Sequence, residues 1–407
     1  MGADYPKNST AARYNYQQSL LPTTNGMVVV RTVYDGSYRV RWGACAKKRS
    51  TLALRSEIVF LHGRMDSITH GALGIAVALL IAPPELRKKA ALAGLIAAEL
   101  PDMDVFLFSQ GDPLFTLQIH RHFTHALVAI PFLAVLGVIL ANFLRLLCRR
   151  SGVWRGMWLP ALAAAATHGF CDTWTSYGTH LLWPFSQRRE SWDLISVIDP
   201  LLTLPLLAGA IMGWLRGRWL PAASGLAWVG VYLALCFVQQ HRAKEAVAAA
   251  AALRGHGAER LTVKPSFGNI MVWRGLYVHD GICHVICVRP GITGGVRLLG
   301  TSSAPLLDPE HPAPPLDSLP VDSVQANDVR RFQHFSDEWI GVHPQHPGVI
   351  GDLRYAKRPD LIDPLWGIAL DPAQPGQHVK LVYFRDLSDG TMSQLWQMVL
   401  GNGVSAP

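Results

Sequence analysis

Histidine and aspartate residues gather in short clusters at the boundaries of apolar segments between residues 66 and 172. In the first cluster Asp66 precedes His70 by four residues, and in the last His168 precedes Asp172 by four, so each pair shares one face of a helix. Imidazole nitrogen and carboxylate oxygen are good ligands for Zn²⁺, and also for Mn²⁺ or Fe²⁺. The spacing therefore predicts a divalent-metal site assembled from several helix ends.

Two further clusters lie between these pairs. Asp102 and Asp104 stand in a Pro-Asp-Met-Asp sequence that interrupts an apolar segment. His120, Arg121 and His125 open the next segment. Because ionisable groups are costly at membrane depth, such a set is expected to meet around a cavity, a partner or a metal. The predicted metal ligands are His70, Asp102, Asp104, His120, His125, His168 and Asp172.

The predicted catalytic residues are Arg121, Asp66 and Asp104. A guanidinium beside metal ligands can hold a phosphate or a carboxylate through its fork of donors, so we expect Arg121 to bind substrate charge. Either Asp66 or Asp104 would be the general acid or base, and the residue types leave this choice open. Asp66 has three alternative roles: a helix cap, a further metal ligand, or a residue that orients His70. His122 and His180 are weaker ligand candidates.

The composition favours a membrane protein. Charged residues make up 16% of the chain, against roughly 25% in soluble domains, and hydrophobic residues make up 50%. The net charge of +8 resides largely in short basic runs between apolar stretches, which is typical of membrane loops rather than of a nucleic-acid-binding face. The six cysteines form neither a disulfide framework nor a paired zinc motif. The expected partners are membrane lipids and a small-molecule or lipid substrate, without nucleic acid.

The apolar segments predict helices of which several match a membrane span of about 20 residues. We therefore expect an α-helical membrane bundle of about five or six transmembrane helices, followed by a smaller, mainly β C-terminal domain. Asp199 before Pro200 is expected to cap the fifth helix. The predicted helices cover roughly residues 68–82, 90–108, 126–147, 157–174, 200–215 and 219–238.

The basic loops predict an orientation. With six spans, nine cations fall on one side of the membrane, which the positive-inside rule assigns to the cytoplasm. The histidine and aspartate clusters then face the periplasm of a bacterial inner membrane. The cations are Arg87, Lys88, Lys89, Arg145, Arg149, Arg150, Arg155, Arg216 and Arg218.

Four regions are expected along the chain. Residues 1–64 read as a leader that is disordered or not native, with Met65 as the native start. Residues 65–240 form the transmembrane metal-binding domain, 241–254 a helical linker and 255–407 a soluble, mainly β domain. Strands are predicted at Leu261–Val263, Ile270–Val278, Ile282–Val288 and Val379–Phe384.

The ordered set of motifs resembles the YdjM/YbcI family, bacterial inner-membrane proteins described as metal-dependent hydrolases. The resemblance covers roughly residues 65–215, and the later part is similar to the extension of a longer subgroup. Two departures are His122, where the family often has Gly, and Ala126, where it often has Ser. The matching residues are Asp66-x-x-Thr69-His70, Pro101-Asp102-x-Asp104, His120-Arg121-x-x-Thr124-His125, His168-x-x-x-Asp172 with Tyr177-Gly178, and, in the extension, Pro265, Asn269, Trp273 and Asp352-Leu353-Arg354-Tyr355.

The family is thought to be distantly similar to zinc-dependent phospholipase C and P1 nuclease, which implies phosphodiester hydrolysis on several zinc ions. We expect a membrane-bound metal-dependent hydrolase, with zinc as the preferred metal and Mn or Fe as alternatives. It would cleave a phosphoester of a lipid or envelope-related substrate by metal-activated water. The alternatives are a non-catalytic protein that binds or transports metal, and a cluster that only staples the helices together.

Overall fold

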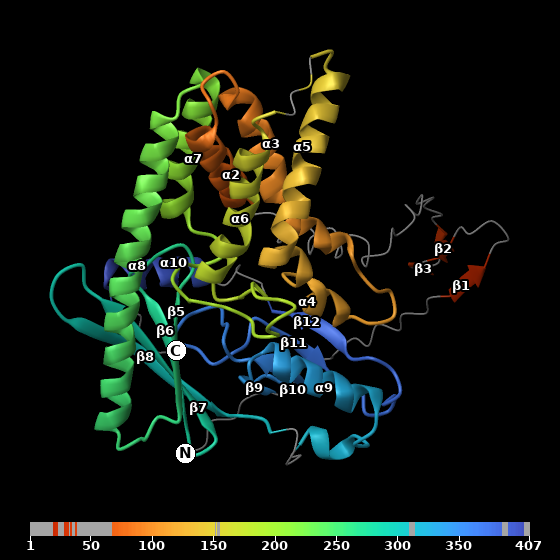
Figure 1. The fold of residues 1–407 in the computed structure, drawn as a ribbon. Coiled ribbons are helices and arrows are strands. Elements are labelled where there is room, and N and C mark those ends of the chain that lie inside the picture. Colours follow the sequence, from red (N-terminus) through yellow and green to blue (C-terminus); the bar gives the residue numbers. More distant parts are fainter. Residues whose placement is uncertain are drawn as a thin grey trace, which may run out of the picture. The chain divides into compact units, whose positions relative to one another are not determined.

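The computed structural model describes residues 67–150, 152, 155–308, 314–384 and 390–402, together with the backbone of four short strands nearer the N-terminus (Figure 1). The chain divides into two compact units, residues 1–62 and 63–407. In the first unit β1 (Ser19–Pro22) pairs with β2 (Val28–Arg31), and β3 (Val33–Tyr34) pairs with β4 (Ser37–Tyr38), both antiparallel. The rest of the predicted leader lies outside the described residues, and so do Met65 and Asp66.

The second unit begins with a group of apolar helices joined by short 3₁₀ turns. Pro101 ends α3, because its ring has no N–H and cannot continue the helix, and the chain turns into the 3₁₀ helix η1. Asp199 caps α7 by accepting hydrogen bonds from the backbone N–H groups of Leu201 and Leu202, as predicted. The helices are α2 (Ser67–Ile81), α3 (Arg87–Glu99), η1 (Pro101–Phe106), α4 (Phe115–Ile119), η2 (Phe123–His125), η3 (Leu127–Ala129), α5 (Ile130–Leu147), α6 (Trp158–Trp174), α7 (Pro200–Arg216) and α8 (Leu220–Leu253).

The expected bundle of five or six transmembrane helices is wrong. Within the described residues, two helical segments are long and apolar enough to cross a membrane, Leu127–Leu147 and Leu220–Leu253. The other apolar runs fold into shorter helices: α2 has 15 residues and α3 has 13, so they extend about 22 and 20 Å, short of a 30 Å hydrocarbon core. The expected periplasmic orientation of the site depended on six spans and loses that support.

The α2 and α3 helices approach each other closely at two glycines. A Cβ atom on Gly74 would lie 2.5 Å from the carbonyl oxygen of Gly94, and a Cβ atom on Gly94 would lie 2.5 Å from that of Gly74. Only residues without a side chain fit there, so the backbones pack directly against each other. This close packing brings the start of α2 beside the end of α3, where the candidate ligands begin.

Two four-stranded antiparallel sheets follow the helices. The first has the order β5-β6-β7-β8 and the second β12-β11-β10-β9. The predicted strands are observed as β5, β6, β7 and β12, whereas β8 to β11 were not predicted. The elements are β5 (Arg260–Pro265), β6 (Trp273–His279), β7 (Ile282–Pro290), β8 (Val296–Pro305), α9 (Val324–Phe335), β9 (Ile340–His343), β10 (His346–Asp352), β11 (Trp366–Ala369), β12 (Lys380–Tyr383) and α10 (Thr391–Leu400).

The α8 helix connects the helices to the first sheet without interruption (Figure 1). Its first half packs in the helical core through Tyr232 and Cys236, and its second half packs on the sheet through Val247. The predicted linker 241–254 is therefore the continuation of this helix. The second sheet packs against α9 in a separate core, which also includes Leu114 from the helical part.

Candidate metal centre

The candidate ligands come from four different elements that end at the same place. His70 lies in the first turn of α2, Asp102 in η1 and His125 in η2. His168 and Asp172 lie one turn apart on α6. All five side chains except that of Asp102 are fully or almost fully buried, and Asp102 is partly buried. The fold thus gathers residues up to about a hundred positions apart into one buried polar cluster.

Four atoms in this cluster converge on one point. The Nε2 atom of His125 lies 3.0 Å from His168 Nε2, 3.2 Å from Asp172 Oδ2 and 3.3 Å from Asp102 Oδ1. His168 Nε2 lies 3.4 Å from Asp102 Oδ1 and 3.6 Å from Asp172 Oδ2. Ligands of a tetrahedral zinc ion, with bonds of 2.0–2.1 Å, lie about 3.3 Å from one another. Each of these five separations, 3.0–3.6 Å, is close to the edge of such a tetrahedron.

The outer nitrogen of each histidine faces an acceptor, which fixes the ring tautomer. His168 Nδ1 lies 2.5 Å from the carbonyl oxygen of Ala98, in the last turn of α3. His125 Nδ1 lies 2.9 Å from Thr124 Oγ1, whose hydroxyl donates to Asp104 Oδ2 at 2.9 Å. When each Nδ1 donates its proton to this acceptor, the two Nε2 lone pairs face each other. This is the arrangement that metal-binding histidines adopt, because a cation between the lone pairs removes their repulsion.

The Asp172 carboxylate is buried among positive and neutral donors. Its Oδ1 lies 3.1 Å from Arg121 Nη2 and 3.3 Å from His70 Nε2. No described residue donates a well-directed hydrogen bond to either oxygen. Burial alone would raise the pKa of Asp172, but the Arg121 guanidinium and His70 hold it well below its usual range, so the carboxylate is ionised. An ionised, buried carboxylate without well-directed donors fits a divalent cation. The neighbouring imidazole nitrogens and carboxylate oxygens are likewise of the types that bind such an ion.

Asp104 anchors the loop that carries His125. Its Oδ1 lies 2.8 Å from His120 Nδ1, and its Oδ2 accepts hydrogen bonds from the Arg121 backbone N–H at 3.0 Å and from the Thr124 hydroxyl. Arg121 adopts a positive φ of 62°, which is unusual for a residue with a side chain. The turn directs its N–H to Asp104 and its guanidinium to Asp172. Asp104 and His120 therefore lie beside the four converging atoms and bind each other.

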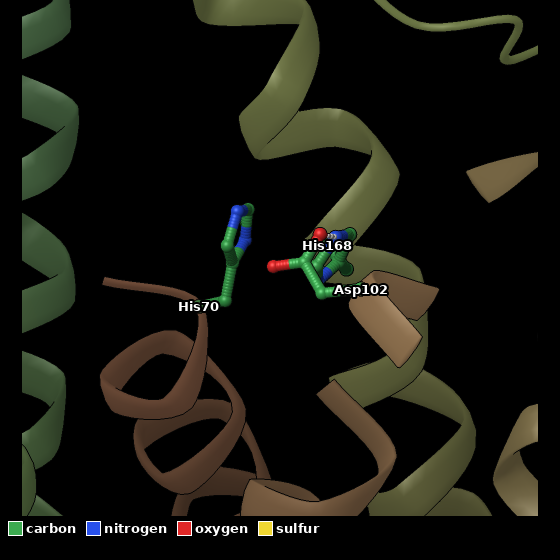
Figure 2. A group of neighbouring side chains, drawn as sticks. All are labelled: His70, Asp102 and His168. Atoms are coloured by element: carbon green, nitrogen blue, oxygen red, sulfur yellow. Dashed lines mark ion pairs between the residues drawn. The ribbon is translucent and has the colours of Figure 1, made fainter. Parts of the chain in front are cut away.

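His70 stacks on His168 across the cluster. The ring centroids lie 3.8 Å apart with an angle of 19° between the planes. Figure 2 shows both rings, with the Asp102 carboxylate next to His168. His70 also groups with Asp102 and His168 as possible ligands of one ion, while its Nε2 lies 3.3 Å from Asp172 Oδ1.

Glu99 closes the cluster from the end of α3. Its Oε1 would lie 2.8 Å from a Cβ atom on Gly71, so the carboxyl group sits over α2 next to His70. Burial raises the pKa of Glu99 to about 7, against the opposing effect of His70 and His168. Glu99 is therefore the carboxyl group of this region that exchanges a proton near neutral pH.

A loop formed by residues 175–195 covers the cluster. Thr179 and Glu190 exchange backbone hydrogen bonds of 3.0 and 2.8 Å across it, and the His180 N–H donates to the Arg121 carbonyl. The Thr175 hydroxyl accepts a hydrogen bond of 3.0 Å from Arg121 Nη1. His122 and His180 pack against each other, with ring centroids 4.7 Å apart, on the outer side of this loop. Neither belongs to the converging set.

The structure therefore brings together five of the predicted ligands: His70, Asp102, His125, His168 and Asp172. Asp66 lies outside the described residues. Sequence reasoning did not identify the Ala98 carbonyl or the Thr124 hydroxyl as partners of the histidines, although Thr124 belongs to the recognised motif. It also gave no role to Arg189, which donates from Nη2 to the His120 carbonyl at 2.9 Å.

Comparison with known proteins gives matches to the helical part of the chain. The sequence model of the YdjM inner membrane protein family matches residues 65–243, which end before both sheets. The inner membrane protein YbcI of Escherichia coli (strain K12) is 31% identical over 170 residues, covering 40% of this chain and 95% of YbcI. The uncharacterized protein YfhP of Bacillus subtilis (strain 168) is 29% identical over 178 residues, covering 42% of this chain. The match spans only 51% of YfhP. No solved structure matches the chain.

Proposed function

Because this chain belongs to the YdjM family of inner membrane proteins and its helix ends gather a convergent set of imidazole and carboxylate groups, we propose that it is a divalent-metal-dependent hydrolase of the bacterial inner membrane. The observation that carries the proposal is the approach of His125 and His168 to each other and to the Asp102 and Asp172 carboxylates, at 3.0–3.6 Å. Zinc suits this N₂O₂ donor set best, and Mn or Fe would also be accepted.

Each residue has a distinct task in this account. Asp102, His125, His168 and Asp172 would hold the metal, which when bound acts as a Lewis acid and lowers the pKa of water. Arg121 neutralises Asp172 and keeps it ionised, while Asp104 and Thr124 hold His125 in the correct tautomer. Glu99, with its pKa raised by burial to about 7, can accept a proton at neutral pH.

A phosphoester is the proposed substrate class, and a membrane lipid or an envelope precursor is its proposed source. The chain's membership of an inner membrane protein family supports a substrate from the membrane or the envelope. The distant likeness to zinc-dependent phospholipase C and P1 nuclease stays a prediction. The buried position of Arg121, which is engaged with Asp172 and Thr175, favours a structural and electrostatic task over direct contact with the substrate.

The test is hydrolysis of a panel of phosphomonoesters and phosphodiesters by the detergent-purified full chain, loaded in turn with Zn²⁺, Mn²⁺ or Fe²⁺. The account expects activity that a chelator abolishes and that Asp102→Asn lowers by at least about 100-fold. The matched control is His241→Ala, which removes an imidazole that is 65% exposed and pairs with Glu245 on α8. Metal-loaded protein that cleaves no ester of the panel would leave a metal-binding membrane protein instead.

A further inference from the structure

A cavity of about 750 Å³ lies between the 175–195 loop, α9 and the first sheet. Its size is that of a site for a small organic molecule. Tyr177 lines the cavity and connects it to the candidate metal centre, because its ring lies 5.8 Å from the His120 ring and 5.1 Å from the Arg121 guanidinium. Six Lys and Arg residues line it: Arg188, Arg189, Lys264, Arg330, Arg331 and Arg354.

The carboxylates that also line the cavity offset only part of this charge. Asp193 pairs with Lys264 at 2.7 Å. Asp337 and Glu338 both pair with Arg260, which is not among the lining residues. Arg331 and Arg354 are engaged with aspartates of their own, and Arg188 lies 3.6 Å from Glu190. Among the residues that the structure describes, the lining cations left without a carboxylate partner are Arg189 and Arg330.

Arg189 is held rigidly at the wall of the cavity. Its guanidinium lies 4.7 Å from the centre of the Tyr177 ring and 4.8 Å from that of the Phe335 ring, so it contacts both members of an aromatic pair. Its Nη2 donates to the carbonyls of His120 and Leu117, whereas its buried Nη1 has no hydrogen-bond partner in the described part of the chain. A largely buried cation of this kind is costly unless an anion accompanies it.

We propose that this cavity binds the phosphate group of a small organic phosphate, with Arg189 as the central anion-binding residue. A planar, prearranged guanidinium suits the oxygens of a phosphate. That the bound phosphate is the substrate of the adjoining metal centre rests on the proposed function. The binding of phosphate itself does not. The phosphate comes either from a soluble ester or from a lipid headgroup, and both present the same chemistry to the cavity.

Calorimetric titration of the detergent-purified full chain with glycerol 3-phosphate tests the inference, in metal-free and in zinc-loaded form. We expect binding in both forms, weakened about 10- to 100-fold by Arg189→Gln. Arg189→Lys keeps the positive charge but not the planar guanidinium. Its affinity for glycerol 3-phosphate is expected to lie between those of wild type and Arg189→Gln. Arg218→Gln is the control, because it removes one exposed positive charge from the connection between α7 and α8 and should change the affinity by less than about twofold.

Nanodiscs that contain phosphatidic acid, compared with discs of phosphatidylcholine alone, separate the two sources. Competition by phosphatidic acid assigns the site to a lipid headgroup, and binding of glycerol phosphate without such competition assigns it to a soluble ester. Wild-type protein that binds no glycerol phosphate, or equal affinity in the Arg189→Gln and Arg218→Gln variants, overturns the inference. A chain that takes up no metal but still binds glycerol phosphate would refute the hydrolase and leave the anion site standing.

Discussion

The Nε2 atoms of His125 and His168 lie 3.0 Å apart. The Nδ1 atom of each ring lies within hydrogen-bond distance of an acceptor, the Ala98 carbonyl for His168 and the Thr124 hydroxyl for His125. When both Nδ1 atoms donate to these acceptors, the two Nε2 lone pairs face each other and repel. A cation between the lone pairs makes the arrangement favourable.

Arg121→Met should destabilise the metal-free protein by about 3–5 kcal/mol, because it leaves the buried Asp172 carboxylate without its cation. A divalent ion at the site would replace part of the missing positive charge. Added Zn²⁺ should therefore raise the melting temperature of Arg121→Met more than that of wild type. Thermal unfolding with and without Zn²⁺ measures both effects, and an equal shift in the two proteins would mean that Asp172 does not face the metal.

Asp104→Asn should weaken metal binding without abolishing it. Asp104 orients the 120–125 loop through hydrogen bonds to His120, the Arg121 N–H and Thr124, and partners of this kind typically change metal affinity by about 10- to 100-fold. Asp102→Asn removes the charge of a carboxylate that faces both histidines, and it should weaken metal binding more than Asp104→Asn does. Competition with a chelator of known affinity ranks the two variants. If Asp104→Asn loses more affinity than Asp102→Asn, then Asp104 is itself a ligand.

Gly169→Ala should disturb the centre through the backbone alone. A Cβ atom at this position on α6 would lie 2.5 Å from the carbonyl oxygen of His125, so η2 has to move away from His168. We expect a loss of about 1–3 kcal/mol in unfolding free energy and weaker metal binding. Gly230→Ala on α8 is the matched control, because its Cβ would meet nothing within 4 Å, and it should be neutral or stabilising by up to about 1 kcal/mol.

Glu99→Gln should change how stability depends on pH in the metal-free protein. Because burial raises the folded-state pKa of Glu99 from 4.5 to about 7, its contribution to stability is fully present below pH 4.5 and is lost as the pH rises through 7. The variant stays neutral, so it should gain stability relative to wild type between pH 5 and 8. Melting temperatures measured across this range check the sign, and parallel curves for the two proteins would show that Glu99 does not titrate there.

The sequence predicted which histidine and aspartate side chains lie together better than it predicted the architecture around them. The spacing of His168 and Asp172 places both on one face of α6 whatever surrounds the helix, and Asp102 follows a proline that must end α3. The number of spans could not be predicted in the same way. Hydropathy alone does not separate a membrane-crossing helix from a short apolar helix such as α2, which packs against its neighbours through glycines.

The roles of two residues depended on contacts that no local pattern shows. Asp104 stands two residues after Asp102 in the same motif, but the 3₁₀ turn directs it to the 120–125 loop instead of the converging atoms. Arg189 belongs to a polar run that reads as an exposed loop, and its place between Tyr177 and Phe335 arises only when α9 packs against this loop. Strands β8 to β11 were also missed, since several of their residues are glycine, serine or proline, which are less common in strands than branched and aromatic residues.

The central claim is that the converging histidines and carboxylates bind a metal ion, and metal content measures this most directly. Detergent-purified wild type should carry at least one equivalent of zinc, manganese or iron per chain, or take it up on reconstitution. His168→Ala and Asp172→Asn should lose most of it while remaining folded, and the exposed control His241→Ala should keep it. A folded wild-type protein that takes up no metal, or variants that retain the wild-type content, would contradict the account.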